Sequence, residues 1–184
     1  MNPQMKAIRE VHEFMTARQV PYMIIGGIAL QYWGEPRFTR DIDVTILIPY
    51  EREREILEKI LSSFMHRISD ALEFALKHRI CLVKSNDGYE IDMSLGIMGY
   101  EESAINRAVN FDLGGHQVKI CSAEDLIIHK TVAGRPRDEA DIESIVIRQG
   151  NKLDVDYIRQ WLQEFSLLLG TEEILERFER FWRT

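Results

Sequence analysis

The chain has 184 residues, of which 45% are hydrophobic and 29% are charged, and its formal net charge is −7. This composition is typical of a soluble globular protein, and the length suits a single domain or one domain with an extension. The acidic balance argues against a general nucleic-acid binder, because such proteins usually present a basic stripe. No apolar signal segment opens the sequence and no run approaches the length of a membrane span, so we expect a cytoplasmic protein that does not contact a membrane.

The first predicted elements are a helix, a strand and a second, shorter helix. Apolar residues recur at helical spacing over residues 5–19, and the apolar run Tyr22–Ile25 predicts a buried strand. Gly26 and Gly27 follow, and the run Ile28–Trp33 predicts a short helix. Paired glycines between a strand and a helix let the backbone approach a ligand closely, and the N–H groups at the start of a helix attract anions. We therefore expect Gly26 and Gly27 to bind a phosphate group.

The next predicted strand, over residues 41–48, carries two carboxylates. Asp41 and Asp43 share one face of it because side chains alternate along a strand, while the other face is β-branched and suits a core. Two neighbouring carboxylates repel each other unless a cation lies between them, and carboxylate oxygens are good ligands for Mg²⁺, Ca²⁺ or Mn²⁺. A phosphate-binding turn followed by such a strand predicts a site for a metal-bound nucleoside triphosphate.

The middle of the chain predicts two helices followed by a hairpin, while residues 63–69 have no clear pattern. The sequence Asn86-Asp87-Gly88 between two apolar runs is a strong hairpin signal. The predicted elements are a helix over residues 51–62, a helix over residues 70–78, and strands over residues 79–84 and 89–95.

The second strand of this hairpin also carries carboxylates. Glu90, Asp92 and Ser94 alternate with apolar residues and therefore share one polar face. By itself this pattern fits an exposed sheet face as well as it fits a functional site. Asp112 precedes a Gly-Gly pair and is explained by a turn.

The remainder of the chain predicts a second hairpin and then helices only. Ser122 precedes Asp125 by three residues, which is close to a capping box, and Asp138 is a suitable N-cap. The expected elements are a helix over residues 100–106, strands over residues 109–113 and 117–120, and helices over residues 123–132, 138–149, 154–169 and 171–182. We therefore predict an α/β (α+β) fold in which helices flank a mixed β-sheet, with residues 1–150 as one domain and residues 151–184 as a C-terminal helical extension packed on it.

The combination of Ile25-Gly26-Gly27 with Asp41-Ile42-Asp43 resembles the signature of the polymerase-β-like nucleotidyltransferase superfamily. The spacer ends in Arg37-Phe38-Thr39-Arg40, and an Arg-x-Thr-x-Asp-x-Asp run is similar to that of many small members, although many of them have serine at the position of Gly27. A later run around Lys130 resembles the small nucleotidyltransferases that are toxins of type IV toxin–antitoxin or abortive-infection systems. The resemblance covers residues 21–147.

This resemblance implies a reaction and a set of site residues. The reaction is the transfer of a nucleoside monophosphate from a nucleoside triphosphate to an acceptor hydroxyl, with Mg²⁺ or Mn²⁺ and with release of pyrophosphate. Asp41 and Asp43 are expected to bind the metal on the triphosphate. Asp92 is expected to join them on a second metal and to help deprotonate the acceptor, with Glu90 as the weaker candidate. The expected nucleotide and phosphate ligands are Gly26, Gly27, Arg37, Thr39, Arg40 and Lys130.

Several alternatives stay open from the sequence. The chain could instead be a catalytically silent nucleotide-binding module that acts through a partner protein, or a magnesium-dependent hydrolase that uses the same carboxylates. Lys130 could be an ordinary solvated helix lysine, and Arg135 and Arg137 could pair with Asp138 and Asp141 as a structural corner. The acidic net charge favours a small-molecule or protein acceptor over tRNA. The toxin resemblance implies an antitoxin protein as a further partner.

Overall fold

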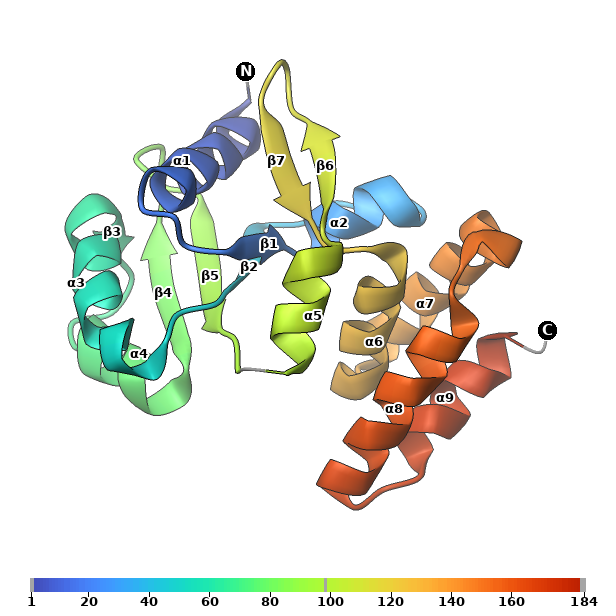
Figure 1. Ribbon diagram of the computed structural model, residues 1–184. Helices are drawn as coiled ribbons and strands as arrows, with labels where there is room; N and C mark the ends of the chain where they lie inside the picture. The colour runs from blue at the N-terminus through green and yellow to red at the C-terminus, as the bar shows by residue number, and fades with distance from the viewer. Residues whose placement is uncertain (1, 98, 183–184) are drawn as a thin grey trace. The chain divides into compact units, whose positions relative to one another are not determined.

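The structure, a computed structural model, describes residues 2–97 and 99–182 of the chain (Figure 1). The chain forms two compact units. Unit 1 comprises residues 1–28 and 38–121, and unit 2 comprises residues 29–37 and 122–184. The spacer between the paired glycines and Asp41 therefore belongs in part to each unit. The predicted domain division into residues 1–150 and 151–184 stays a prediction.

The strands of the described residues all lie in unit 1, where they form one sheet of seven strands. They are β1 (Tyr22–Ile24), β2 (Asp41–Ile46), β3 (Met65–His66), β4 (Ile80–Lys84), β5 (Glu90–Leu95), β6 (Val109–Asp112) and β7 (Gln117–Ile120). Their order across the sheet is β3-β4-β5-β2-β1-β7-β6. β2 pairs in parallel with β5, and β1 pairs in parallel with β7, whereas the other neighbouring pairs are antiparallel. The predicted mixed sheet is confirmed.

The centre of this sheet has one apolar and one polar face. Because β2 and β5 run in parallel, residues that are paired across them point to the same side. The pairs on the apolar side are Ile42 with Ile91, Val44 with Met93 and Ile46 with Leu95. All six of these side chains are buried, so this face forms the core of unit 1. Burial of such side chains contributes roughly 1.5–3 kcal/mol each and specifies which face of the sheet stays available to a ligand.

Four α-helices of the described residues belong wholly to unit 1. They are α1 (Pro3–Ala17), α3 (Glu53–Ser63), α4 (Ala71–His78) and α5 (Tyr100–Arg107), with a short 3₁₀ turn, η1 (Tyr50–Arg52), before α3. Asn2 caps α1, because its side-chain oxygen accepts a hydrogen bond of 2.8 Å from the N–H of Met5. Phe14 of α1 and Phe64, which follows α3, meet edge to face with their ring centroids 5.4 Å apart. Helix α3 packs on α4, and α4 packs beside β4.

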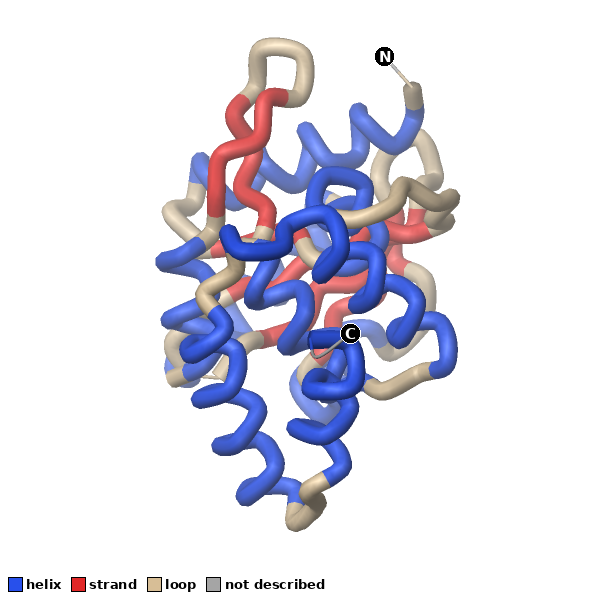
Figure 2. The backbone as a smooth tube through the Cα atoms, turned by 90° about the vertical axis from the view of Figure 1, so that its right-hand side faces the viewer, coloured by secondary structure: helices blue, strands red, loops and turns tan. Residues whose placement is uncertain are grey.

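The regular elements over residues 29–37 and 122–182, which form unit 2, are all helices (Figure 2). α2 (Gly26–Trp33) begins in unit 1 and ends here, and α6 (Ala123–Ala133), α7 (Pro136–Gln149), η2 (Gly150–Lys152), α8 (Val155–Leu169) and α9 (Glu173–Trp182) follow. α6 packs against α7, α8 and α9. A separate apolar core lies among them, formed by Leu126, Ile127, Ile142, Ile145, Ile158, Leu162 and Phe178.

Some element boundaries differ from the prediction. α2 begins at Gly26 and so includes the paired glycines, and β3 lies in the segment that had no clear pattern. α7 begins at Pro136 with Arg135 as its N-cap, so Asp138 was wrongly predicted as the cap. Proline is favourable in the first helical turn, where its missing N–H is not needed, and this moves the start of α7 toward the N-terminus. Over the described part of the chain, none of the helices is both long enough and apolar enough to cross a membrane.

Candidate functional site

The polar face of β2 and β5 brings the predicted carboxylates of unit 1 together. Asp43 lies directly opposite Asp92 in the parallel ladder, and Asp41 lies opposite Glu90. All four side chains are half-buried or more exposed, while the residues between them along each strand are fully buried. Residues at the same register on the same face of neighbouring strands are close neighbours. The fold therefore places four carboxylates on one patch of the sheet.

The backbone at Gly26 presses against the carboxylate of Asp43. Gly26 has φ +63°, and a Cβ atom at this position would lie only 2.0 Å from Oδ2 of Asp43. The N–H of Ile25 also donates a 2.9 Å hydrogen bond to the carbonyl oxygen of Asp43. Any side chain at position 26 would be strained by the positive φ and would displace the carboxylate. Glycine is thus required here by the position of the carboxylate.

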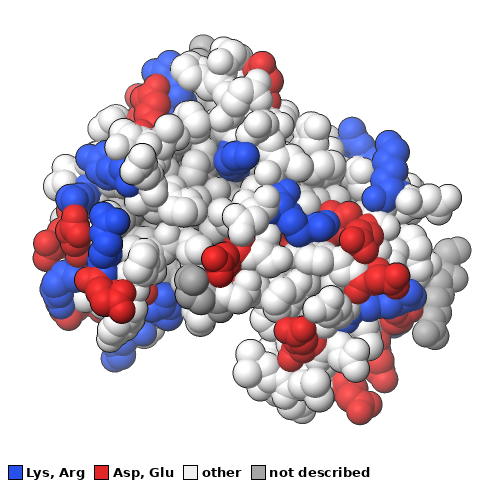
Figure 3. Space-filling model, viewed as in Figure 1, with Lys and Arg blue, Asp and Glu red and all other residues white. Residues whose placement is uncertain are grey.

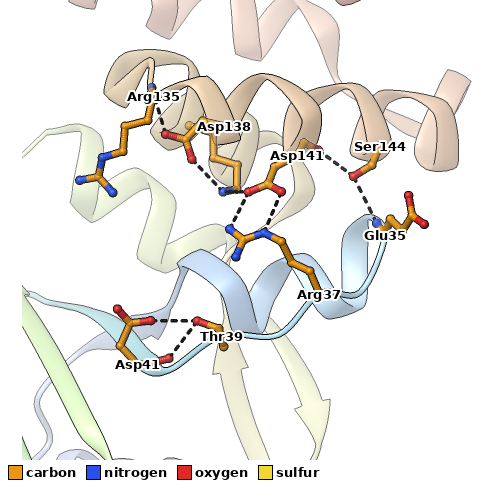
Figure 4. Close-up of polar contacts among 9 residues, drawn as sticks. Glu35, Arg37, Thr39, Asp41, Arg135, Asp138, Asp141 and Ser144 are labelled. Carbon is orange, nitrogen blue, oxygen red and sulfur yellow. Dashed lines mark hydrogen bonds and ion pairs between the residues drawn. The ribbon is translucent and has the colours of Figure 1, made fainter.

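Gly27 is packed against Thr39 in the same way. A Cβ atom on Gly27 would lie 2.7 Å from both Cβ and Oγ1 of Thr39. The Thr39 hydroxyl donates a 2.8 Å hydrogen bond to Oδ1 of Asp41, which fixes the orientation of that carboxylate (Figure 4). α2 begins at Gly26, so the N–H groups of Gly26 and Gly27 lie in its first turn and have no carbonyl partner within the helix. They are the amides predicted to bind a phosphate group.

Tyr89 holds the segment that carries Thr39. Its hydroxyl donates a 2.9 Å hydrogen bond to the carbonyl oxygen of Thr39 and accepts one of 2.8 Å from the side-chain amide of Gln4. Burial raises the pKa of Tyr89, the negative charge of Asp41 raises it further, and the hydrogen bond from Gln4 opposes both. The hydroxyl therefore stays protonated and remains a donor to Thr39. Sequence reasoning had not identified Tyr89, which is separated from Thr39 by 50 residues.

Two basic side chains balance part of the negative charge on β5. The guanidinium of Arg67 forms ion pairs with Asp92 and, at 3.2 Å, with Glu90. The ammonium of Lys84, on β4, lies 3.6 Å from a carboxylate oxygen of Glu90. Arg67 was not predicted as a site residue, because an ion pair between residues 25 positions apart leaves no pattern in the sequence.

The donor set on this face fits a hard divalent cation. Asp41 and Asp43 offer carboxylate oxygens from one strand face, and such oxygens suit Mg²⁺ and Mn²⁺. Across residues 2–97 and 99–182, no three histidine, cysteine or acidic side chains are grouped closely enough to hold a metal ion. On β5 the ion pair with Arg67 holds the carboxylate of Asp92. Asp41 and Asp43 therefore offer donor atoms of the right chemistry for such a cation, although the described side chains alone do not form a complete set of ligands.

Two of the predicted phosphate ligands, Arg37 and Lys130, lie in unit 2, where both bind aspartates of α7. Arg37 binds Asp141 with two parallel hydrogen bonds of 3.0 and 2.8 Å (Figure 4). The ammonium of Lys130 lies 2.5 Å from a carboxylate oxygen of Asp141 and 3.1 Å from one of Asp138. Lys130, Asp138 and Asp141 are all buried, so Lys130 is not a solvated helix lysine. We call these four residues the Asp141 cluster.

The Asp141 cluster is electrostatically stable. Burial raises the pKa of the Asp141 carboxyl, but the hydrogen bonds and charges of Arg37 and Lys130 outweigh burial, so that the pKa lies below its ordinary value. Asp138 also accepts a 3.2 Å hydrogen bond from the N–H of Arg135. The ion pairs of Asp138 and Asp141 are formed with Lys130 and Arg37, whereas the side chains of Arg135 and Arg137, which the sequence suggested as their partners, are exposed.

The segment that precedes Arg37 is bound along α7 within unit 2. The hydroxyl of Ser144 accepts a 3.2 Å hydrogen bond from the N–H of Glu35 (Figure 4). Arg148 donates to the carbonyl oxygen of Gly34 at 2.6 Å, and Gln149 donates to that of Trp33 at 2.7 Å. Residues 33–35, in the middle of the spacer, are therefore held by side chains of one helix.

Each predicted site residue can now be located. Gly26, Gly27, Thr39, Asp41, Asp43 and Asp92 lie in unit 1, and Arg37 and Lys130 lie in unit 2. Arg40, between Thr39 and Asp41, is exposed. Asp112 accepts a hydrogen bond of 2.8 Å from the N–H of Gly115, as expected of a turn residue. The structure thus collects seven of the predicted residues, Arg40 included, together with Glu90, Arg67 and Tyr89, within one unit.

Comparisons with known proteins agree with this fold. A family model described as nucleotidyl transferase of unknown function (DUF2204) matches residues 4–180. A search of curated proteins gave no match. The antibiotic-resistance factor ANT(2'')-Ia is similar in fold, with a TM-score of 0.58 and 20% sequence identity over 91% of this chain and 95% of that one. The lincosamide antibiotic adenylyltransferase LnuA has a TM-score of 0.53 and 11% identity, over 76% of this chain and 94% of its own. An antigenic nucleotidyltransferase-like protein from Paracoccidioides brasiliensis has a TM-score of 0.52 and 17% identity, over 78% of this chain and 74% of its own.

Proposed function

Since the chain belongs to the family of nucleotidyl transferases of unknown function (DUF2204), we propose that it transfers a nucleoside monophosphate from a nucleoside triphosphate to an acceptor hydroxyl, with Mg²⁺ or Mn²⁺ and with release of pyrophosphate. One observation carries this proposal. Asp43 of β2 and Asp92 of β5 occupy the same register on the polar face, with Asp41 beside them and the backbone of Gly26 against Asp43.

Within this proposal, Asp41 and Asp43 hold the divalent cation. A bound cation supplies positive charge that stabilises the triphosphate oxygens as they become more negative. The Thr39 hydroxyl keeps one oxygen of Asp41 in a fixed position, and Gly26 lets Asp43 sit against the start of α2. Both contacts hold the carboxylates in position before the substrate binds, which is the condition for effective electrostatic stabilisation.

Asp92 is assigned to the acceptor. Its carboxylate takes the proton of the acceptor hydroxyl, and the oxygen of that hydroxyl then forms a bond to the α-phosphorus. The bond between the α-phosphorus and the bridging oxygen of the β-phosphate breaks, and pyrophosphate leaves with the electron pair. Positioned proton transfer of this kind typically contributes about a hundredfold or more to a rate.

The phosphate side of the proposal rests on backbone groups and exposed cations. The amides of Gly26 and Gly27 lie in the first turn of α2, where anions are stabilised, and the side chain of Arg40 is exposed beside Asp41. For Arg37 and Lys130 the role of phosphate ligand stays a prediction. Their ion pairs with Asp141 support a structural role in unit 2 as well.

A small-molecule hydroxyl is the acceptor that we propose. ANT(2'')-Ia, which shares the fold, was solved in complex with adenylyl-2''-tobramycin, and LnuA was solved with lincomycin bound. The chain carries a net charge of −7, and acidic and basic side chains are interspersed on the face drawn in Figure 3. An interspersed face of this kind does not form the extended basic track that a polyanion such as tRNA requires. A protein acceptor is the second choice on the same electrostatic grounds.

A role as a toxin controlled by an antitoxin protein is a narrower form of this proposal, and it stays a prediction together with the cytoplasmic location. A catalytically silent nucleotide-binding module remains the contrasting function. The two differ in turnover, because a silent module binds nucleotide without releasing pyrophosphate. The presence of all three predicted carboxylates on one face supports the enzyme.

The test is a pyrophosphate-release assay with each of the common nucleoside triphosphates, Mg²⁺ or Mn²⁺, and a panel of hydroxylated small molecules. We expect acceptor-dependent release by the wild-type chain and none by the Asp41→Asn variant. Glu73→Gln is the matched control, because it removes an exposed carboxylate that pairs with Arg54 away from β2 and β5. Nucleotide binding without any release of pyrophosphate would favour the silent module.

A further inference from the structure

Arg67 lies on the carboxylate patch and belongs to none of the predicted groups of ligands. Two nitrogen atoms of its guanidinium bridge the carboxylates of Asp92 and Glu90. An arginine that binds two carboxylates with separate N–H groups forms a strong, directional contact. The side chain is only 23% exposed, as against 62% for Arg180 in a surface ion pair, so its contacts are less screened by solvent.

The backbone fixes the position of Arg67 before any ligand binds. Arg67 directly follows β3, and its N–H donates a 3.3 Å hydrogen bond to the carbonyl oxygen of Leu82 on β4. Leu82 is in turn paired with Asp92 in the antiparallel β4–β5 ladder. The strand pairing therefore aims the guanidinium across β4 at Asp92, which makes the contact a consequence of the fold.

The charges on the patch indicate what this contact does. Among the four carboxylates of the patch, Asp92 is paired with Arg67, and Glu90 is paired with both Arg67 and Lys84. The guanidinium of Arg67 already supplies at Asp92 the positive charge that a second divalent cation would supply. A cation bound to Asp92 must also displace or repel the guanidinium that already holds its carboxylate.

We infer that the guanidinium of Arg67 competes with a divalent metal ion for the carboxylate of Asp92. The chain therefore binds one metal ion tightly, at Asp41 and Asp43, and does not bind a second at Asp92 while Arg67 is paired. This inference rests on the proposed function and deepens it. Arg67 acts through Asp92 and is therefore a positioning residue. It keeps the carboxylate that receives the acceptor proton in place without a second metal.

The experiment counts Mn²⁺ ions bound to the intact chain. Free Mn²⁺ is measured by electron paramagnetic resonance during a titration, with the protein saturated by a nucleoside triphosphate analogue whose α–β bridge cannot be cleaved. A titration of the analogue alone supplies the Mn²⁺ that it binds by itself. Wild-type protein should bind one tight ion. Arg67→Gln should bind a second ion, with an affinity about tenfold to a hundredfold above the upper limit that the wild-type titration sets for a second ion, the scale of a lost contact between charged groups.

Two further variants test whether the positive charge of Arg67 sets the number of bound ions. Arg67→Lys keeps the positive charge and should retain the wild-type number of ions. Arg54→Gln removes a surface arginine that pairs with Glu73 and serves as the matched control, also without effect. Circular dichroism and a melting curve show that each variant is folded before it is titrated.

Equal numbers of Mn²⁺ ions bound with equal affinities by wild-type and Arg67→Gln would overturn the inference. A second bound ion in Arg67→Lys would overturn it too, as would weaker binding of Mn²⁺ by Arg67→Gln. The proposed function is judged separately, by pyrophosphate release from the wild-type chain. Release of pyrophosphate together with an unchanged titration in Arg67→Gln would reject the inference alone. If wild-type neither released pyrophosphate nor bound Mn²⁺ with the analogue, both would be rejected.

Discussion

Gly26 shows how a single residue without a side chain makes room for the carboxylate of Asp43. Its φ of +63° and the 2.0 Å between a hypothetical Cβ and Oδ2 of Asp43 act together. Gly88 also has a positive φ, +79°, but open space surrounds the position of its Cβ. The two glycines therefore share a left-handed backbone conformation and differ in the contact with a carboxylate.

We predict that Gly88→Ala lowers stability alone, whereas Gly26→Ala lowers stability and also prevents stabilisation by nucleotide. Gly88→Ala should cost about 1–2 kcal/mol in the free energy of unfolding, the cost of a left-handed conformation for alanine, and leave turnover intact. Gly26→Ala should cost more and should abolish nucleotide-dependent stabilisation, because Asp43 must move. Urea unfolding with and without nucleotide and Mg²⁺ measures both. Equal effects of the two substitutions would show that Asp43 does not depend on Gly26.

At the scale of residues, the sequence could predict features that follow from the alternation of polar and apolar residues along a strand. The alternation around Asp41, Asp43 and Asp92 is local, so the strand face of each could be predicted. The partners of these side chains could not, because Arg67 and Tyr89 reach the patch through pairing between distant strands. For the same reason the sequence suggested phosphate ligands at Arg37 and Lys130 and gave no indication that Asp141 binds both.

At the scale of elements, the Asp141 cluster ties α6 and the spacer segment to α7 within unit 2. Asp141→Asn removes the charge that compensates the buried ammonium of Lys130 and the guanidinium of Arg37. Removing one partner of a buried ion pair typically costs about 3 kcal/mol or more. Glu139→Gln on the same helix breaks only the exposed pair with Arg180 and should cost less than about 1 kcal/mol. Similar melting temperatures for the two variants would contradict the structural role.

The lowered pKa of Asp141 predicts how the difference in stability between wild-type and Asp141→Asn depends on pH. A carboxyl whose pKa is lower in the folded state contributes stability that is fully present above its ordinary value of 3.8 and is lost as the pH falls through the folded-state value. The gap in stability between wild-type and Asp141→Asn should therefore be constant near neutral pH and shrink in acid below pH 3.8. Melting curves across this range measure it. A gap that widens in acid would contradict the sign of the pKa shift.

Prediction from sequence worked for elements with a strong local period and failed where tertiary contacts set the boundary. The hairpin of β4 and β5 was predicted from its turn and alternation, and its two strands are observed. β3 comprises only Met65 and His66, too few residues for a periodic pattern. The side chain of Asp138 binds the ammonium of Lys130, which the sequence does not show, and α7 starts at Pro136 instead. The parallel register of β2 with β5 depends on the 43 residues between them, whose packing no local pattern specifies.

At the scale of the whole molecule, charge limits the substrates. With a net charge of −7, the chain should bind tRNA weakly and with a shallow dependence on salt. Fluorescence anisotropy with labelled tRNA at about 50 mM and about 200 mM salt measures this, since a protein that neutralises many phosphates loses about a thousandfold or more in affinity over that range. Tight binding with a steep loss at higher salt would contradict the preference for a small acceptor.

The proposed reaction requires separate roles for the carboxylates on the polar face. Asp43 is assigned to the metal that accompanies the triphosphate, and Asp92 is assigned to the acceptor. Asparagine keeps the shape of each side chain and removes its charge. Loss of Asp92 also breaks its ion pair with Arg67, so the melting temperature of each variant is measured first without ligand.

The most direct measurement combines two readings on wild-type, Asp43→Asn and Asp92→Asn. These are the rise in melting temperature with nucleoside triphosphate and Mg²⁺, and the transfer of label from the α-phosphate to an acceptor. We predict that Asp43→Asn loses both. Asp92→Asn should keep the rise in melting temperature while transfer falls by about a hundredfold or more. Full nucleotide stabilisation in Asp43→Asn, or full transfer in Asp92→Asn, would contradict the assignment of these carboxylates to metal and acceptor.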